Sequence, residues 1–290
     1  MTDNDKTVAG IIKSGADYLA KKGVESPRTA CEYLLGRLLN CPHLNVYAKD
    51  KETLNEKQLE AMRRGIKRVA SGEPVQYVTG RTDFMGHAFK TDPRALIPRP
   101  ETETLVHAVL QEKELWNEEK PIIVDIGTGS GCIIISLAKE KPNAVYIAID
   151  KSEEAISLAQ ENAETLKVKD NIVFTANDMS DFIEPATIDA VVTNPPYIAT
   201  ADYERLPIHI REHEPRTALD GGPTGLAVTE NIIQDAAIIL KPNGFLFLEI
   251  GETQANDVTL LLQKESFSNI SVEKDIAGKN RIVTARNAGI

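Results

Sequence analysis

Cysteine is scarce in this 290-residue chain. It has three cysteines, Cys31, Cys41 and Cys132, and no Cys-x-x-Cys spacing. An odd, widely spaced set argues against a disulfide framework and against a zinc site. The apolar runs are also short, well below the ~20 residues that span a bilayer. The opening segment MTDNDKTVAG has no basic region followed by an apolar one. We therefore expect no signal peptide, no membrane partner and a cytoplasmic location.

Positive charge is also in short supply. The chain has 33 Lys and Arg residues against 43 Asp and Glu residues, which gives a formal net charge of −10. Proteins bind phosphate backbones through Lys and Arg, so an acidic chain is a poor non-specific binder of nucleic acid. A local basic patch stays possible. The charge nevertheless favours a small-molecule, protein or basic partner, and we expect no direct nucleic-acid partner.

The first third of the chain is predicted to be a small helical bundle, residues 1–73. Residues 7–22 carry apolar side chains at helical spacing. Ser26 is a candidate N-cap for a second helix, which Pro27 would begin, and a third helix is expected over residues 55–70. No chemical motif appears in this region. Two interpretations stay open, a stability or dimerisation module and a substrate-recognition domain.

Residues 74–96 differ from the helical region. Short β-prone pieces flank Gly80 and Gly86, which predicts a hairpin linking two domains. A helix is then expected to start near Thr102, and the acids before and after that position suit a helix N-terminus.

Residues 97–290 alternate strands with helices. This pattern predicts an α/β fold with a mostly parallel sheet that helices cover on both faces. Strands are expected at 121–127, 144–150, 172–178, 188–194 and 244–250, with two short ones near 270–274 and 281–285. In such sheets ligands bind at the carboxyl ends of the strands. The residues that directly follow the strands are therefore the candidate site.

A glycine-rich loop follows the first of these strands. It consists of Gly127, Thr128, Gly129, Ser130 and Gly131. The loop is neither GxGxxG nor a P-loop, and by itself it would also serve as a tight strand-to-helix connection. Asp150 ends the next strand, 23 residues after Gly127, and an acid at about that distance fits hydrogen bonding to ribose hydroxyls. This pairing resembles the S-adenosylmethionine loop of Rossmann-like methyltransferases. Asp125 either provides negative charge for a cationic ligand or orients the loop.

The segment TNPPYIA, residues 193–199, ends the strand expected at 188–194. An amide nitrogen attacks poorly because its lone pair is delocalised, so a site must align it and stabilise the developing positive charge. The side-chain oxygen of Asn194 can accept one N–H, and the Pro195 carbonyl, held by consecutive prolines, can accept the other. Tyr197 can lie against the planar group. We therefore predict Asn194, Pro195 and Tyr197 as catalytic residues; an ordinary strand-ending turn is the alternative.

Four segments together resemble one known family. The motif [N/D]PPY resembles that of amino methyltransferases acting on adenine, cytosine and glutamine amides. The family that resembles the whole chain is HemK/PrmC, the protein-(glutamine-N5) methyltransferases of peptide chain release factors. The resemblance rests on residues 72–106, 125–138, 191–226 and 274–287.

The resemblance implies a Rossmann-like class I methyltransferase domain with a seven-stranded sheet, residues 97–290, behind a helical recognition domain. It implies S-adenosyl-L-methionine as donor, S-adenosyl-L-homocysteine as product, and the glutamine of a release factor's Gly-Gly-Gln loop as acceptor. Residues 127–131 would hold the methionine part and Asp150 the ribose, with Asp178 and Met179 by the adenine. The glutamine would be held by Asn194, Pro195, Pro196 and Tyr197. Asn194 would also lie next to the donor.

Other hypotheses compete with this one. They are a glutamine methyltransferase of a ribosomal protein, a nucleic-acid adenine methyltransferase, and a non-catalytic nucleoside-binding or scaffold protein. The adenine enzyme would need a basic groove and a base-flipping domain. His209 and His213, four residues apart, lack a third metal ligand in a clear pattern, so we expect no metal. We expect the protein to be a monomer.

Overall fold

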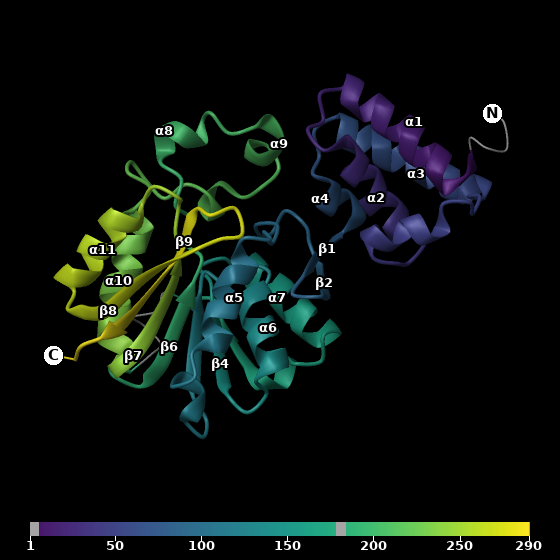
Figure 1. Ribbon diagram of the computed structural model, residues 1–290. Coiled ribbons are helices and arrows are strands. Elements are labelled where there is room, and N and C mark those ends of the chain that lie inside the picture. Colours follow the sequence, from purple (N-terminus) through teal and green to yellow (C-terminus); the bar gives the residue numbers. More distant parts are fainter. Residues whose placement is uncertain (1–5, 178–183, 290) are drawn as a thin grey trace. The chain divides into compact units, whose positions relative to one another are not determined.

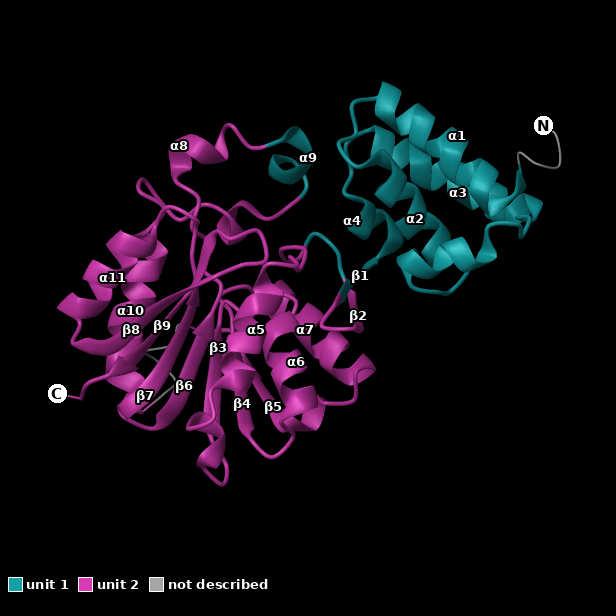
Figure 2. Cartoon of the chain, viewed as in Figure 1, with its two compact units in different colours: residues 1–83, 91–93, 207–213 teal, residues 84–90, 94–206, 214–290 magenta. Residues whose placement is uncertain are grey.

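The computed structural model describes residues 6–177 and 184–289 (Figure 1). The chain divides into two compact units (Figure 2). The helical unit consists of residues 1–83, 91–93 and 207–213, and the sheet unit consists of residues 84–90, 94–206 and 214–290. In the described part of the chain, no helix combines the length and the apolar character needed to cross a bilayer.

The helical unit is a bundle of short amphipathic helices. They are α1 (Val8–Lys21), α2 (Pro27–Leu38), the 3-10 helix η2 (His43–Lys49), α3 (Glu56–Ala70), α4 (Val75–Thr79) and α9 (Ile208–Arg211). The three predicted helices are confirmed. Thr7 caps α1 by accepting from Gly10 N, and Asn55 forms a capping box with Gln58 at the start of α3. Pro27 begins α2 after Ser26, although the Ser26 side chain makes no capping hydrogen bond.

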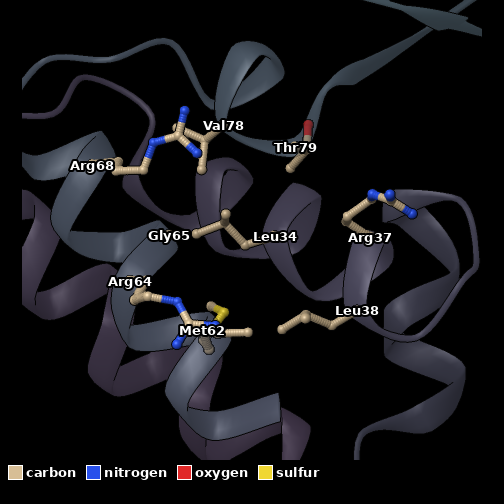
Figure 3. Close-up of a pocket in the computed structure, with 10 residues that line it drawn as sticks. Leu34, Arg37, Leu38, Met62, Arg64, Gly65, Arg68, Val78 and Thr79 are labelled. Atoms are coloured by element: carbon tan, nitrogen blue, oxygen red, sulfur yellow. The ribbon is translucent and has the colours of Figure 1, made fainter. Parts of the chain in front are cut away.

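The core of the helical unit is apolar, with α1, α2 and α3 each contributing one face. A cavity of about 260 Å³ lies among α2, α3 and α4 (Figure 3). Its lining includes Leu34, Met62 and Gly65 together with Arg37 and Arg68.

One local expectation for the linker is wrong. The β-prone piece before Gly80 forms the helix α4, since Pro74 precedes it and Gly80, at φ 70°, ends it. The strands of the predicted hairpin begin after that helix. They are β1 (Arg81–Phe84) and β2 (His87–Lys90), which form a two-stranded sheet.

The sheet unit contains seven strands in the order β5-β4-β3-β6-β7-β9-β8. They are β3 (Ile122–Ile126), β4 (Val145–Ile149), β5 (Ile172–Thr175), β6 (Ile188–Thr193), β7 (Leu240–Glu249), β8 (Phe267–Lys274) and β9 (Asn280–Asn287). The strands from β5 to β7 pair in parallel, whereas β9 pairs antiparallel with both β7 and β8. The predicted seven-stranded, mostly parallel sheet is confirmed.

Helices cover both faces of this sheet, as the alternating side chains of its strands require. The main helices are α5 (Thr102–Gln111), α6 (Cys132–Glu140), α7 (Glu153–Thr165), α10 (Ala227–Ile239) and α11 (Ala255–Lys264); shorter ones are η3 (Leu115–Asn117), η4 (Lys169–Asn171), α8 (Thr200–Tyr203) and η6 (Arg216–Ala218). Ile123 packs in the core with α5 and α6, whereas its neighbour Val124 packs in the core with α10 and α11.

The register of the central strands places four strand ends at one level. Ile126 pairs with Ile149 on one side and with Thr193 on the other, and Thr193 pairs with Leu248. The next residue along each strand is therefore at the same carboxyl edge of the sheet: Gly127, Asp150, Asn194 and Glu249.

Candidate active site

The loop after β3 has a backbone that glycine adopts readily. Gly127, Gly129 and Gly131 have φ angles of 71°, 54° and 80°, all in the left-handed region. The amides of Gly127 and Thr128 both donate to the carbonyl of Ile149 on β4, at 2.8 and 2.9 Å. The loop is thus turned back over the end of the neighbouring strand.

Gly131 also permits a close approach between helices. A Cβ at this position would lie 2.7 Å from Cδ1 of Ile135 and 3.1 Å from Cβ of Ala159 on α7. The carbonyl of the preceding residue, Ser130, accepts from Nδ2 of the buried Asn162 at 2.9 Å. The third glycine therefore lets α6 begin against α7 while the loop stays open at the sheet edge.

Asp150 lies beside the glycine loop and at the start of the helical segment that follows. Its Oδ2 accepts from Gly129 N at 2.9 Å, and its Oδ1 accepts from Ser152 N at 2.9 Å. The contact to Ser152 N agrees with a charge at the start of a helix. The contact to Gly129 N places the carboxylate beside the glycine loop, where a ligand contact is also expected. The contact to Gly129 joins the predicted ribose-binding residue to the predicted loop.

Asp125 is fully buried under the loop. Its Oδ2 accepts from the Thr128 hydroxyl at 2.7 Å, which supports a loop-orienting role. Its Oδ1 has no hydrogen-bond partner among the described residues. Burial raises the pKa of Asp125 to about 7, and the negative charge of Asp150 acts in the same direction. Asp125 is thus a buried carboxylate with one unpaired oxygen, a feature that occurs preferentially at functional sites.

The NPPY segment follows β6 at the level of the glycine loop. Asn194 is half-buried, and its Nδ2 donates to Oγ1 of Thr102 at 3.1 Å. Among the described residues, no group donates to Oδ1 of Asn194 or to the carbonyl of Pro195. Burial raises the pKa of the Tyr197 phenol to about 12, so this side chain is a neutral hydroxyl at ordinary pH. Two acceptors and an aromatic ring therefore lie within four residues.

The backbone of NPPY is held by two other segments. Gly221 N donates to Ile198 O at 2.8 Å, and the Gln254 side chain donates to Tyr197 O at 3.0 Å. A Cβ at Gly221 would lie 2.4 Å from Pro196 O, so the two backbones are in direct contact. Residues 219–225 are thus packed directly against the candidate acceptor site.

The sequence analysis missed Glu249. This carboxyl group ends β7 and is 1% exposed. The neighbouring side chains of Thr102 and Tyr197 favour its ionised form, and its Oε2 has no partner among the described residues. Burial raises its pKa to about 7. The signal was present in GFLFLEI, where one acid ends an otherwise apolar strand at the edge on which ligands bind.

The other residues considered in the sequence belong to the helical unit, to the core of the sheet unit or to the part of the chain that is not described. Asp178 and Met179 fall outside the described residues. His209 and His213 belong to the helical unit, where Nδ1 of His213 lies 3.2 Å from the carbonyl of His209. Cys132 is buried in the core of the sheet unit, and burial raises the pKa of its thiol to about 12.

The chain resembles known proteins in both units. A family model described as the PrmC N-terminal domain matches residues 11–80, and one described as the methyltransferase small domain matches residues 102–209. The release factor glutamine methyltransferase of Rhodopirellula baltica is 36% identical over 293 residues, 99% of this chain and 99% of that protein. The protein with the same description in Moorella thermoacetica is 40% identical over 268 residues, 92% of this chain and 94% of that one. A solved methyltransferase structure from Pyrococcus furiosus shares the fold, with a TM-score of 0.51 and 18% identity over 81% of this chain and 100% of that one.

Proposed function

This chain belongs to the family of release factor glutamine methyltransferases, and we propose that it methylates the side-chain amide nitrogen (N5) of a glutamine in a peptide chain release factor. The acceptor is the glutamine of the factor's Gly-Gly-Gln loop. The single observation that carries the proposal is the strand register, which sets Asn194 level with Gly127 and Asp150. A donor and an acceptor amide bound at these residues would lie on the same edge of one sheet.

S-adenosyl-L-methionine supplies an electrophilic methyl group when it is bound and becomes S-adenosyl-L-homocysteine. Residues 127–131 would line its methionine part, where their positive φ angles would let the backbone approach the ligand closely. Asp150 would accept from the ribose hydroxyls, in place of or beside its contact to Gly129. The unpaired oxygen of Asp125 fits a ligand that carries positive charge. For the adenine we keep the prediction of Asp178 and Met179.

The acceptor amide is bound by NPPY. Oδ1 of Asn194 accepts one N–H of the glutamine, and the Pro195 carbonyl accepts the other. These two acceptors orient the nitrogen and favour the positive charge that develops on it. Tyr197 lies against the planar amide, while Pro196 restricts the backbone that carries the Pro195 carbonyl.

We assign different functions to the parts of the chain. We propose that residues 1–73 recognise the release factor, that residues 74–96 link the units and that residues 97–290 perform methyl transfer. The match of residues 11–80 to a domain model specific to this family supports the first assignment. We further propose a cytoplasmic monomer with no nucleic-acid or membrane partner. The net charge of −10 supports the absence of a nucleic-acid partner.

The decisive experiment is label transfer. The protein is incubated with S-adenosyl-L-methionine carrying a labelled methyl group and with a release factor, either native or with its loop glutamine changed to alanine. We expect label only in the native factor, at the glutamine amide by mass spectrometry. A ribosomal protein preparation and a DNA duplex serve as competing acceptors. Equal labelling of the altered factor would contradict the proposal.

The variant Asn194→Ala tests the acceptor site separately. Loss of one positioned polar group of this kind lowers turnover by roughly a hundredfold or more. We expect that loss together with an unchanged dissociation constant for the donor, measured by calorimetry. Retained turnover would remove Asn194 from its role, and a lost donor affinity would place it on the donor side.

A further inference from the structure

The turn between β8 and β9, residues 275–279, lies on the same edge of the sheet as the candidate acceptor site. β9 runs antiparallel to β7, and its Ile282 pairs with Glu249, the last residue of β7. The chain before Ile282 therefore continues past the carboxyl end of β7 (Figure 1). Asn194 follows the neighbouring strand β6 at that same level. The turn thus belongs to the edge on which the glutamine would bind.

The segment directly after β7 contacts both NPPY and the start of β9. Gln254 donates to Tyr197 O at 3.0 Å, and a Cβ at Gly251 would lie 3.5 Å from Cδ2 of the Tyr197 ring. On the other side, Arg281 Nη1 donates to Ile250 O at 3.1 Å, and Ile250 N donates to Arg281 O at 2.8 Å. A path of direct contacts therefore joins Arg281 to the aromatic residue of NPPY.

Asp275 connects the turn to Arg281 and fixes its backbone. Its Oδ1 accepts from two backbone N–H groups within the turn, at 2.9 and 3.0 Å, and Arg281 Nε donates to its Oδ2 at 3.2 Å. Gly278, at φ 77°, donates its N–H to Asp275 O at 2.9 Å. Asp and Gly are favoured at the first and fourth positions of a β-turn. The turn is therefore specified by these residues, and the side chain of Ile276 takes no part in the contacts.

Ile276 is the second residue of this turn, and it is 100% exposed. The next most exposed large apolar side chains in the described part of the chain are Leu44 at 66% and Leu260 at 64%. Single exposed apolar side chains are common on protein surfaces, so exposure alone does not indicate a function. Ile276 differs because a well-supported turn presents it at the edge of the candidate acceptor site, where small polar residues are the usual choice. Its side chain contributes no packing to the fold and is available to a partner.

We propose that Ile276 is an apolar contact for the release factor beside its glutamine loop, so that the turn 275–279 extends the acceptor site onto the surface around that loop. This inference rests on the proposed function. The partner is an apolar side chain of the factor itself, because the glutamine that enters the site brings the neighbouring surface of the factor to this edge. Ile276 thereby contributes to binding the protein substrate and not to the transfer step.

Ile276→Ser tests this role, and Ile276→Leu is its conservative counterpart. We expect Ile276→Ser to raise the KM for the release factor by about 10-fold, because apolar contact is lost in the complex. The kcat at saturating factor should not change, since the contact is made equally in the ground state and the transition state. Donor affinity by calorimetry and the urea midpoint should also match the wild type, because the side chain packs against nothing in the free protein. Ile276→Leu should restore the KM to within a few fold.

Ile238→Ser is the matched control. Ile238 is also an exposed isoleucine, 55% exposed on α10. Its carbonyl accepts from Ala186 N at 3.0 Å, two residues before β6 begins, so it lies at the opposite end of the sheet. Its replacement by serine should leave the KM for the factor unchanged.

The possible outcomes separate this inference from the proposed function. An unchanged KM in Ile276→Ser, or a lower kcat with an unchanged KM, overturns the inference and leaves the proposed function standing. An equal rise of KM in Ile238→Ser also overturns it, because the effect would then not depend on the turn. Loss of self-association in Ile276→Ser by sedimentation, without a change in KM, would assign the residue to a second copy of this chain and overturn it as well. Absence of transfer by the wild type overturns both.

Discussion

Buried carboxylates at the carboxyl edge of the sheet differ from the buried carboxylate of the helical unit. In the helical unit, Glu32 is buried but accepts from the side chains of Arg28 and Tyr47. In the sheet unit, Asp125 and Glu249 each keep one oxygen without a partner among the described residues. Unpaired buried acids are costly for folding and occur preferentially at functional sites. The contrast indicates that the sheet unit gives up stability at its carboxyl edge, whereas the helical unit does not.

The glycines of the loop and of the helices are required for different reasons. The three loop glycines at the sheet edge have positive φ angles, whereas the glycines inside the helices α2 and α3 have no such angle and are restricted by packing. We therefore expect substitutions in the glycine loop to lower both stability and donor affinity. Substitutions in the helical unit should change stability alone.

The largest effect is expected at the glycine loop. Gly131→Ala combines a positive φ of 80° with a Cβ 2.7 Å from Ile135. The conformational cost is about 1–2 kcal/mol, and the overpacking cost about 1–3 kcal/mol. We expect the urea midpoint of the sheet unit and the donor affinity to fall together.

Gly278→Ala is the matched control for that variant. Gly278 has a φ of 77°, but a Cβ there would meet no atom within 4 Å. It should cost only the conformational part, about 1–2 kcal/mol, and leave donor affinity unchanged. Equal losses in the two variants would show that packing against α7 is not what makes Gly131 necessary.

The next largest effect concerns Asp125. Its pKa is raised from 3.8 to about 7 in the folded protein, so folding takes up a proton between these values. The resulting stability is fully present below about pH 4 and is lost as the pH rises to about 7. Asp125→Asn lacks this loss. We expect its free energy of unfolding to gain on the wild type by roughly 4 kcal/mol between pH 4 and pH 8, in denaturation curves across that range.

The effects of Asp125→Asn on stability and on donor affinity are expected to have opposite signs. Donor affinity should fall in Asp125→Asn because a negative charge is removed from the site, so stability and binding should change in opposite directions. A stability difference that does not vary with pH would show that the carboxylate is not strained in the folded protein.

The smallest effect is expected in the helical unit. A Cβ in Gly36→Ala would lie 2.9 Å from the backbone oxygen of Cys41. Backbone moves little, so we expect a net loss of about 1–2 kcal/mol after the helix-propensity gain. In Gly65→Ala the Cβ would meet the end of the Leu34 side chain, which borders the cavity and has room to turn (Figure 3). That variant should be nearly neutral.

Both helical-unit variants should bind the donor like the wild type. The free energies of unfolding and the calorimetric donor affinities provide the measurement. A loss of donor affinity in Gly36→Ala comparable to that in Gly131→Ala would end the distinction between the two units.

Much of the sheet unit followed from its pattern of strands and helices. Apolar runs separated by amphipathic segments located all seven strands, and the residues after the strands located Gly127, Asp150 and Asn194 at one edge. The helix α4 was missed because Val75–Thr79 has strand propensity, while the flanking Pro74 and Gly80 impose helix boundaries. Local propensity was weaker than its context there.

Glu249 could not be assigned from local pattern alone. Its place beside the candidate site depends on the strand register, which sets it level with Asn194 across β6 and β7. The predicted residues Asp178 and Met179 lie outside the described part of the chain and stay predictions.

The contact between NPPY and the segment 219–226 restricts how this site can evolve. A Cβ at Gly221 would lie 2.4 Å from Pro196 O, and one at Gly225 would lie 2.4 Å from Tyr197 O. The position of the candidate acceptor site is therefore determined by main chain packed on main chain, which point substitutions cannot adjust in small steps. Descendants of this protein that acquire a new substrate should keep this backbone arrangement and vary the surfaces around it.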